Sequence, residues 1–598
     1  MKVIALSDYS RLAELLSLEI KEYAYILVDF DRLDIEDIFV KTGLRKTELR
    51  EGLGNIDFKN EYINFIGRLN KYYNSIYWWA NTVSYKGTFA SDLCTDIFNY
   101  YCLVSLIKRR GSNYIILSKG LVLNAYIEKY CSANGIEITI FGSRKKKNAL
   151  SHVKKWIGSS LYFLLDGWFR KSFAFIYFNK NVNKLKKDKH YYVIRSWIDR
   201  RSFAENNRYG DIYFGRLPDY LKERQKEYIV LAGILTGYKK IFKELKKLKQ
   251  YVIVPQEYFV GYIDYLKVII SNAINRPKIL KPALFCGLEV TDLLKAALDK
   301  DYECGEVNKN LIYYYYVKGV LKKIKIGVFA FPFENHSWEK MSMFAVRKYS
   351  PSTKVLGYVH STLRPYLLNY FYSKDEEDVM PFADKIVTTG KEPKILLQEN
   401  GNYKNKIEVS EGCALRYEYI FKKNDILWDK KGKILVTLSM DISCAVKLLK
   451  FLYDALADKN KYEIVLRAHP FTPLDMITRL SNIRLSSNFQ VSKNKNFNED
   501  LKNTALLIYT NATTGVEALT LGIPVVYVDL KPPLNMDPLF KLDFLKWVVS
   551  DKEDLCNVID RIYNMGEAEH QAGYRKALSH LRDYFYPVEE KYLQEFMI

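Results

Sequence analysis

Hydrophobic and polar positions follow one another along the chain in an order that predicts strands and helices in turn. Residues 505–509 are an apolar run of strand length, residues 510–514 are mostly small and polar, and residues 516–521 have helical periodicity. Gly522 ends this helix, and residues 525–528 form a second apolar run. Such a β–α–β unit requires parallel strands with helices on the faces of the sheet. We therefore predict an α/β protein.

The same pattern divides the chain of 598 residues into four parts. Three of them alternate strands with helices, and one is rich in basic and aromatic residues. The expected parts are an N-terminal α/β accessory domain, a linker, and two further α/β domains: residues 1–143, 144–189, 190–400 and 401–598. The best-defined strands are residues 25–28, 114–117, 137–141, 191–194, 228–232, 325–331, 355–359, 385–388, 433–438, 462–467, 505–509 and 525–528.

Candidate acid–base residues follow two strands of the region 190–400. Glu334 and His336 come after one strand, and His360, Ser361 and Arg364 come after the next. A carboxylate and imidazoles at one sheet edge suit general acid–base chemistry. The alternative is that the side chains of Glu334 and His360 bond to loop backbone and hold the crossover.

Candidate anion-binding residues follow two strands of the C-terminal region. They combine a cation, an imidazole and small polar side chains: Arg467, His469, Pro470, Asn511, Thr513 and Thr514. Ligands of open α/β sheets bind outside the carboxyl ends of the strands, and a helix start there favours phosphate. The alternative is that Thr513 and Thr514 only cap the helix.

Composition narrows the class of protein. The formal net charge is +22, which indicates either attraction to anionic lipid, glycan or nucleotide, or a compositional drift in which Lys, Asn, Ile and Tyr are all abundant. No recognised nucleic-acid module is present, so we expect no nucleic-acid partner. The eight cysteines form no CxxC pair or Cys/His cluster of zinc spacing, so we expect that most of them are buried thiols in a reducing cytoplasm. No run of 18 uncharged apolar residues occurs, and we expect no transmembrane helix.

The linker, residues 144–189, has its own character. It holds thirteen Lys and Arg against two Asp, interleaved with aromatic and aliphatic residues. This combination is typical of an amphipathic segment at a membrane surface. A helical linker that packs on a neighbouring domain is the alternative.

Two of the strand ends carry a resemblance. His469-Pro470 and Thr513-Thr514 are similar to the HP and Ser/Thr motifs with which GT-B glycosyltransferases of the CMP-Kdo and sialic-acid type hold the phosphate of CMP. The pattern NATTGVEAL followed by GIPVV also resembles CDP-glycerol phosphotransferases of wall teichoic acid synthesis. The blocks WWANT, IRSWID, FGRLPDYL, FENHSWE and GYVHSTLR are similar to a family of bacterial surface-carbohydrate (O-antigen or capsule) biosynthesis proteins.

The resemblance implies a GT-B fold, in which two Rossmann-like domains face a cleft and a C-terminal helix returns to the first of them. It implies transfer of a sugar, a CMP-activated Kdo or nonulosonic acid, to a glycan or lipid-linked acceptor at the inner membrane surface, without a metal cofactor. The acidic-acidic-Gly motif that supplies the base in the sialyltransferase-like families has no match at the equivalent place. Glu334 is therefore assigned as base from its position, with His360 and His336 beside it.

Three alternatives stay open. In the first, the protein is a transferase whose donor is a CDP-glycerol-type or UDP/GDP-hexose compound instead of a CMP-sugar. In the second, it is a non-catalytic scaffold of glycan assembly. In the third, its positive charge serves nucleic-acid binding. Nucleotide binding, turnover and the salt dependence of oligonucleotide binding separate these classes.

Overall fold

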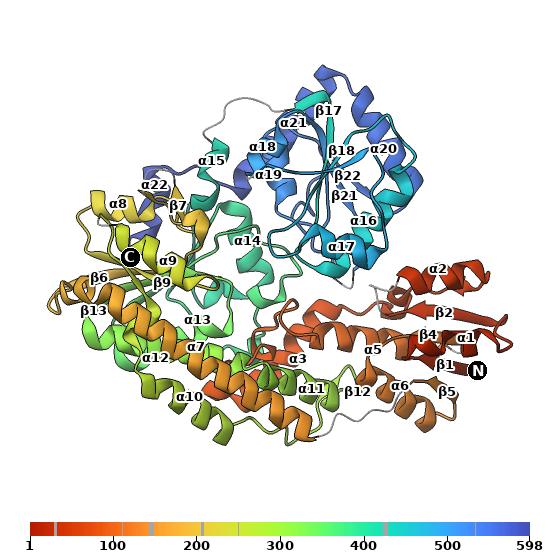
Figure 1. The fold of residues 1–598 in the computed structure, drawn as a ribbon, viewed down its shortest axis with the longest axis horizontal. Helices are drawn as coiled ribbons and strands as arrows, with labels where there is room; N and C mark the ends of the chain where they lie inside the picture. Colours follow the sequence, from red (N-terminus) through yellow and green to blue (C-terminus); the bar gives the residue numbers. More distant parts are fainter. Residues whose placement is uncertain are drawn as a thin grey trace.

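The computed structural model describes residues 1–28, 33–109, 112–142, 149–204, 208–248, 250–421, 428–494, 496–532 and 534–598. These residues form three units, each built on a parallel sheet (Figure 1). In Figure 1 the N-terminal unit lies at the right, the middle unit at the lower left and the C-terminal unit at the top. The expected fold class, α/β with two Rossmann-like domains and an additional N-terminal α/β region, is confirmed by this topology.

The N-terminal unit has a five-stranded parallel sheet in the order β3-β2-β4-β1-β5. Its strands are β1 (Lys2–Leu6), β2 (Tyr23–Leu27), β3 (Arg45–Lys46), β4 (Asn113–Leu117) and β5 (Glu137–Phe141). Its helices are α1 (Leu12–Leu16), α2 (Leu33–Lys41), α3 (Phe58–Tyr73), α4 (Ile76–Trp79), α5 (Leu93–Lys108) and α6 (Leu121–Ala133).

The middle unit has a seven-stranded parallel sheet in the order β10-β9-β6-β13-β14-β15-β16. Its strands are β6 (His190–Trp197), β9 (Tyr228–Gly233), β10 (Ile253–Pro255), β13 (Lys325–Pro332), β14 (Lys354–Tyr358), β15 (Lys385–Thr388) and β16 (Glu408–Glu411). Its helices are α7 (Ala149–Asn183), α8 (Leu217–Glu223), α9 (Tyr238–Lys247), α10 (Tyr262–Ile274), α11 (Thr291–Glu303), α12 (Glu306–Lys323), α13 (Ser337–Tyr349) and α14 (Lys391–Asn400). Two short antiparallel pairs, β7 (Phe203–Ala204) with β8 (Arg208–Tyr209) and β11 (Leu284–Phe285) with β12 (Leu288–Glu289), lie outside this sheet.

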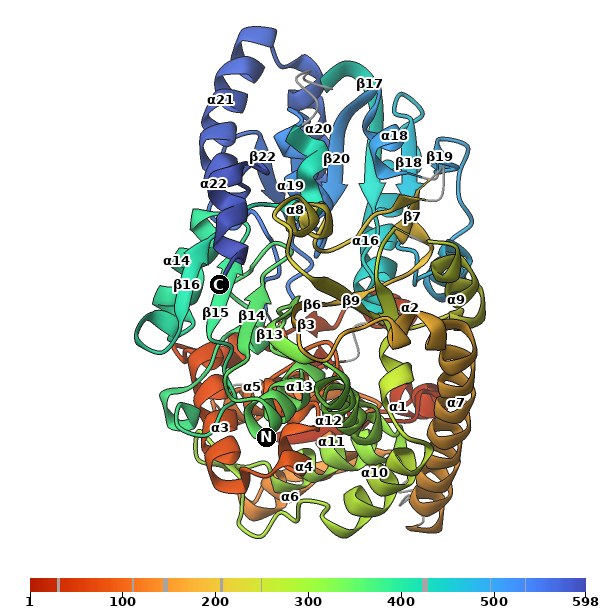
Figure 2. The ribbon, with the colours of Figure 1, turned by 90° about the vertical axis from the view of Figure 1, so that its left-hand side faces the viewer.

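The C-terminal unit has a six-stranded parallel sheet in the order β19-β18-β17-β20-β21-β22. Its strands are β17 (Trp428–Thr437), β18 (Ile464–Arg467), β19 (Phe489–Val491), β20 (Thr504–Tyr509), β21 (Val525–Val528) and β22 (Lys546–Val549). Its helices are α15 (Glu418–Phe421), α16 (Ile442–Leu456), α17 (Leu474–Ser481), α18 (Phe497–Leu501), α19 (Thr514–Thr520), α20 (Lys552–Asn564), α21 (Glu567–Tyr584) and α22 (Glu590–Leu593). Figure 2 shows α21 and α22 running from this unit back towards β16 of the middle unit.

The expected boundary at residue 143 does not separate two hydrophobic cores. Phe58 of α3 packs against Phe285 at a ring distance of 5.4 Å, and helices α3 and α5 share one buried cluster with α11, α12 and α13. Lys86 and Glu376 form an ion pair of 2.5 Å across this junction, and both side chains are fully buried. The N-terminal and middle units are therefore joined by a common core.

The expected linker is a helix of the middle unit along most of its length. Phe178 of α7 packs on Phe242 of α9 at a ring distance of 5.8 Å, and Phe163 packs on Tyr265 of α10 at 5.4 Å. This contact face agrees with the alternative of a helix packed on its neighbour. The opposite face of α7 is exposed. Residues 144–148 of the expected linker lie outside the described residues.

Two adjacent segments connect the middle and C-terminal units. The chain leaves β16 through residues 412–417 and returns after α21 through residues 585–589. The main-chain N–H of Ala414 donates to the carbonyl of Tyr586 at 3.0 Å, and the Tyr586 hydroxyl donates to Glu411 at 3.0 Å. The two crossings therefore lie side by side and are bonded to each other.

Candidate functional site

Strand order places both groups of candidate residues at the point where a ligand crevice is expected. In the middle and C-terminal sheets the first strand, β6 or β17, lies between the second and the fourth in chain order. The direction of winding therefore reverses between β6 and β13, and again between β17 and β20. Open α/β sheets bind ligands outside the carboxyl ends of the strands at such a reversal.

In the middle unit, Glu334 lies between two histidines. Its carboxylate oxygens are 3.4 Å from Nδ1 of His336 and 3.7 Å from Nε2 of His360. About a third of the Glu334 and His336 side chains is exposed, whereas His360 is buried and packs edge-on against Tyr213. Three sequence-predicted residues from two neighbouring strand ends therefore form one cluster.

The ionisation states in this cluster suit proton transfer to the carboxylate. Burial lowers the pKa of His360 to about 4, so its ring is neutral at pH 7. Burial acts to raise the pKa of Glu334, but the charges of His336 and His360 in their protonated forms and of Arg416 hold that pKa below its ordinary value. Glu334 is therefore an ionised, partly exposed base at neutral pH.

Two side chains of α13 hold the loop that carries Glu334. The buried carboxylate of Glu339 accepts the main-chain N–H of Glu334 at 3.1 Å and that of Asn335 at 2.8 Å. Lys340 donates to the carbonyl of Asn335 at 2.6 Å, and burial lowers the pKa of Lys340 to about 7. Asn335 has a φ of 57°, a left-handed conformation that asparagine tolerates better than most residues. Glu339 and Lys340 thus position the Glu334 loop.

Arg364 links the two strand-end groups directly. This buried residue follows β14, and its Nη1 donates to the carbonyl of Asn511, which follows β20, at 3.0 Å. Ser361 lies 3.3 Å from the hydroxyl of Tyr417 on the crossing segment. The carboxyl edges of the two sheets therefore meet at this contact, as expected for two Rossmann-like domains that face each other.

In the C-terminal unit, the threonines lie at the reversal of strand order. The hydroxyl of Thr514 is 2.7 Å from that of Thr437, the last residue of β17. Thr513 is the N-cap residue of α19, but its side chain makes no capping bond and instead bonds Glu517. Asn511 donates to the sulfur of Cys444 at 3.3 Å. Because Thr513 does not cap through its side chain, the simple capping alternative does not describe it.

The remaining predicted residues lie at the end of β18 and differ in their surroundings. Arg467 is paired with buried Asp500 and donates to the carbonyl of Asn494 at 3.1 Å, so its guanidinium supports the β18–β19 edge. His469 and Pro470 form a partly exposed turn, in which the His469 Nδ1 accepts the main-chain N–H of Phe471 at 3.2 Å. Burial lowers the pKa of His469, and the cation of Arg201 lowers it further.

Several residues of this cleft were not predicted from the sequence. Arg416, from the crossing segment, lies 5.5 Å above the ring of Tyr213 and acts on Glu334 through its field. Thr437 and Arg201 adjoin the C-terminal candidates. Tyr213 and Arg416 lie far from Glu334 in sequence, and no spacing pattern signals their approach. Among the described residues, no group of three or more His, Cys, Asp or Glu side chains has the geometry of a metal site.

Comparison with known proteins gives remote similarities of structure. No protein-family model matches the chain, and no curated protein matches it in sequence. A glycosyltransferase from Rickettsia africae is 14% identical over 69% of this chain and 97% of its own, with a TM-score of 0.38. A UDP-GlcNAc 2-epimerase from Methanocaldococcus jannaschii, solved with UDP-GlcNAc and UDP, is 14% identical over 65% and 99%, with a TM-score of 0.38. The glycosyltransferase SnogD from Streptomyces nogalater is 13% identical over 68% and 99%, with a TM-score of 0.36.

Proposed function

We propose that the protein is a glycosyltransferase that moves a sugar from a nucleotide-sugar donor to a glycan or lipid-linked acceptor. The observation that carries this proposal is the contact between two sheet edges through Arg364 and Asn511, with Glu334 between two histidines on one edge and the threonines beside Thr437 on the other. Such a cleft has a base for an acceptor hydroxyl on one side and hydroxyl donors for a leaving phosphate on the other.

The proposed roles follow from these positions. Glu334 accepts the proton of the acceptor hydroxyl, with neutral His360 and His336 orienting its carboxylate. Thr513, Thr514 and His469 hold the phosphate of the donor. The sequence motifs favour a CMP-activated acidic sugar and a role in bacterial surface-polysaccharide assembly. CDP-glycerol-type and UDP- or GDP-hexose donors are the alternatives within the transferase class.

Nucleotide-dependent melting tests this proposal and its alternatives. The melting temperature of the purified protein is measured with CMP, CDP, UDP and GDP, because a ligand of the native state raises it by mass action. A rise with CMP alone supports the acidic-sugar donor, CDP supports alcohol-phosphate transfer, and UDP or GDP supports hexose transfer. His469→Ala should reduce the rise, and His190→Ala, at an exposed position outside the cleft, should not. No rise with any nucleotide contradicts the proposal. Binding without turnover would favour the scaffold alternative.

Helices α7 and α10 support the further proposal that the acceptor is reached at an anionic membrane surface. Leu161, Leu165 and Phe169 of α7 are 53%, 44% and 58% exposed and recur every fourth residue along one face. Ile263 and Ile270 of α10 are 65% and 57% exposed. The two helices are adjacent, and Figure 2 shows them on one side of the molecule. Apolar faces of this extent on a monomer mark an interaction surface.

The positive charge of these helices favours an anionic bilayer as the binding partner of this surface. The positive charge lies on α7, which carries Lys154, Lys155, Arg170, Lys171 and Lys180, and of these Lys155 pairs with Glu303 of α11 at 3.3 Å. The single acidic residue of each helix is matched by a cation, Asp166 by Arg170 at 2.7 Å and Asp264 by Lys267 at 3.7 Å. Each lysine near anionic lipid contributes about 1 kcal/mol. Among the described helices, none is long and apolar enough to cross a membrane. The proposed attachment is therefore peripheral, through the apolar and basic face of α7 and α10, at the cytoplasmic side of the membrane.

Vesicle flotation tests the membrane surface separately from catalysis. The protein should float with phosphatidylglycerol vesicles and much less with phosphatidylcholine vesicles. Leu165→Asp combined with Ile270→Asp should abolish flotation, whereas Leu480→Asp, at a 53% exposed position on α17, should not. Equal flotation of the double variant would contradict the proposal. Dimerisation of the wild type that the double variant loses would assign the surface to a second copy instead.

A further inference from the structure

A buried carboxyl, that of Glu517, lies beside the candidate threonines of the donor site. Glu517 belongs to the first turn of α19, and its side chain is 8% exposed. The hydroxyl of Tyr419 on α15 donates to this carboxyl, and the hydroxyl of Thr513 also bonds it. Among the described residues, Arg416 on the crossing segment is the charged group that acts on Glu517. An acid that was not predicted from the sequence is therefore in contact with the proposed phosphate site.

The elements that pack on α19 bring no further charge to this carboxyl within the part of the chain that the structure describes. On α21, His570 and Tyr574 bond main-chain carbonyls at 2.7 and 2.8 Å. The rings of Tyr509 on β20 and Tyr527 on β21 pack on each other at 5.5 Å, and Tyr509 donates to Asp537 at 2.7 Å. The protonation state of the carboxyl therefore depends on its burial and on the three groups named above.

The hydroxyl of Thr513 has a single hydrogen, and two acceptors compete for it. An ionised carboxylate only accepts hydrogen bonds, so Thr513 donates to Glu517 as long as Glu517 is ionised. The oxygens of an ionised phosphate are also acceptors. Thr513 therefore cannot donate to a phosphate in the donor site while its hydrogen is directed to the carboxylate.

Thr514 does not have this conflict, because its partner is a hydroxyl. Its own hydroxyl lies 2.7 Å from that of Thr437, and either of the two can be the donor. When Thr437 donates, the hydrogen of Thr514 is available to a ligand. The count of hydrogens thus separates two neighbouring threonines of the same turn.

The charge of Glu517 also opposes a phosphate beside Thr513. Burial raises the pKa of Glu517, and the bond from Tyr419, the charge of Arg416 and the bond from Thr513 offset only part of this effect. A phosphate at Thr513 would add negative charge and favour the neutral carboxyl further. A protonated Glu517 no longer repels the phosphate, and its O–H can donate to Thr513.

We propose that Glu517 positions Thr513 for the donor: when the phosphate binds, Glu517 takes up one proton from solvent and donates to Thr513, whose own hydrogen turns to a phosphate oxygen. Apart from the O–H bond formed on Glu517, no covalent bond changes. Tyr419 keeps its bond to Oε2. Glu517 acts through Thr513 and does not touch the phosphate, and this inference rests on the proposed donor site.

Proton uptake on nucleotide binding tests the inference. The binding enthalpies of CMP, CDP, UDP and GDP are measured by titration calorimetry between about pH 6 and 8, in buffers of different ionisation enthalpy. The dependence on the buffer gives the number of protons bound. Glu517→Gln keeps the size of the side chain and can donate to Thr513 without a proton from solvent. The wild type should take up as much as about one proton more than Glu517→Gln. Protons bound by His469 or by the nucleotide itself contribute to both proteins and cancel.

The pH dependence of affinity gives a second measurement. A bound phosphate raises the pKa of Glu517, so proton and phosphate favour each other's binding. The affinity of the wild type should fall as pH rises from the pKa of the free protein to that of the complex, by up to about tenfold per pH unit. Glu517→Gln should lack this part of the fall.

Two variants of Thr513 make the test independent of the folding of Glu517→Gln, because Thr513 is only half-buried. Thr513→Ser keeps the hydroxyl and should take up as many protons as the wild type. Thr513→Ala should weaken nucleotide binding about tenfold, because it removes a charged hydrogen bond. It should also take up fewer protons, because Glu517 then has no hydroxyl to donate to.

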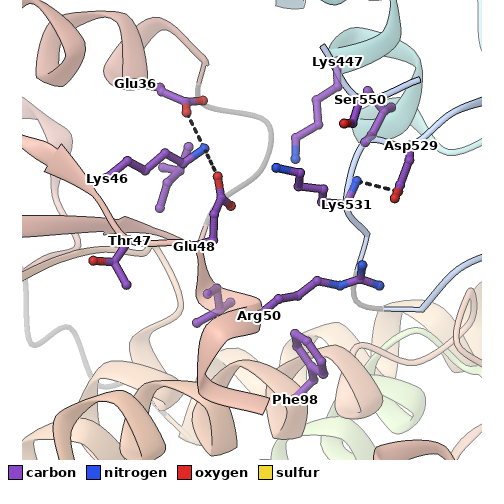
Figure 3. A pocket seen from close by; sticks show the side chains of 13 residues that line it. Glu36, Lys46, Thr47, Glu48, Arg50, Phe98, Lys447, Asp529, Lys531 and Ser550 are labelled. Carbon is purple, nitrogen blue, oxygen red and sulfur yellow. Dashed lines mark hydrogen bonds and ion pairs between the residues drawn. The ribbon is translucent and has the colours of Figure 1, made fainter. Parts of the chain in front are cut away.

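The pocket in Figure 3 supplies the control for protons bound elsewhere. It lies between the N-terminal and C-terminal units, and its lining includes Lys447 but neither Glu517 nor Thr513. Burial lowers the pKa of Lys447 to about 8, so a nucleotide bound in that pocket would also favour uptake of a proton. Lys447→Met should therefore take up as many protons as the wild type.

Each outcome has a separate meaning. A surplus of protons in the wild type over Glu517→Gln that persists in Lys447→Met and Thr513→Ser supports the proposal. Equal uptake at every pH in the wild type and Glu517→Gln, or in the wild type and Thr513→Ala, overturns this inference and leaves the proposed glycosyl transfer intact. Loss of the surplus in Lys447→Met assigns the proton to the other pocket and overturns the inference too. Absence of binding by every nucleotide contradicts the proposed function and this inference with it.

Discussion

The buried ion pair between Lys86 and Glu376 gives a direct test of the common core of the N-terminal and middle units. Glu376→Gln preserves the size of the side chain and removes its charge. The Lys86 ammonium, which is fully buried and 2.5 Å from the Glu376 carboxylate, is then left without its counter-ion. Breaking a buried pair from one side costs about 3–5 kcal/mol. The carboxylate also accepts the main-chain N–H of Ser373 at 3.0 Å through the oxygen that faces Lys86, and the side-chain amide of Asn70 through its other oxygen. The amide oxygen of glutamine can preserve the bond to Ser373, but the bond from Asn70 is then lost and adds to the cost.

The expected shift in melting temperature follows from the size of the unit. Unfolding entropy is roughly 2.1 cal/mol/K per residue, so a joined unit of roughly 400 residues loses about 4–6 °C for this cost. Differential scanning calorimetry measures the shift. The double variant Lys86→Met with Glu376→Met should lose much less than the sum of the single variants, because replacing both charges removes the unpaired ion. Lys552→Met, which removes a half-exposed pair with Asp454, should hardly change the melting temperature.

Two results would refute this reasoning. A shift below about 1 °C in Glu376→Gln would mean that the pair is solvated in solution. Separate melting of the N-terminal unit, with the middle unit unaffected by the variant, would mean that the two units do not share a core. Additive losses in the double variant would show that the two charges act independently.

Three further predictions concern the cleft. Glu334→Gln should lower turnover by about 10²–10⁴-fold and leave nucleotide binding unchanged, and full activity in this variant would exclude Glu334 as the base. In the folded protein the pKa of His360 is about 4, below the value of about 6.5 for an unfolded histidine. The unfolded chain therefore binds the proton first, and the free energy of unfolding decreases as the pH falls from about 6.5 to 4. His360→Asn should therefore show a shallower fall of melting temperature with acid, and an equal slope would contradict the assigned burial. Arg364→Met removes a charged bond to Asn511 and should weaken nucleotide binding about 10–100-fold in titration calorimetry, and unchanged affinity would show that the link does not support the donor site.

The sequence predicted the central strands well because they are apolar on both faces. Residues 325–331 and 505–509 were expected as strands and lie within β13 and β20. The edge strands β16, β19 and β22 were not predicted, because they are partly exposed, whereas the equally short strand β21 is fully buried and was predicted. Pairing with a neighbouring strand, which no local pattern encodes, decides their structure.

The sequence predicted which candidate residues lie close together only where they follow neighbouring strands of one sheet. Glu334 and His360 follow neighbouring strands of one sheet, so their approach follows from the parallel topology. The approach of Arg416 and the link from Arg364 to Asn511 depend on how two separate sheets face each other. The Lys86–Glu376 pair joins residues 290 positions apart, and the sequence shows only two unremarkable charges.

The paired crossings between the middle and C-terminal units restrict how the cleft opens. A single tether would leave the C-terminal unit free to twist and slide, but two tethers bonded at Ala414 and Tyr586 form a short double strap. Gly390 lies against the C-terminal end of α21, where the returning crossing begins, and an added Cβ would come within 2.6 Å of the carbonyl oxygen of Asp583. Two bonded crossings favour rotation of the C-terminal unit about the line that joins them over twisting or sliding.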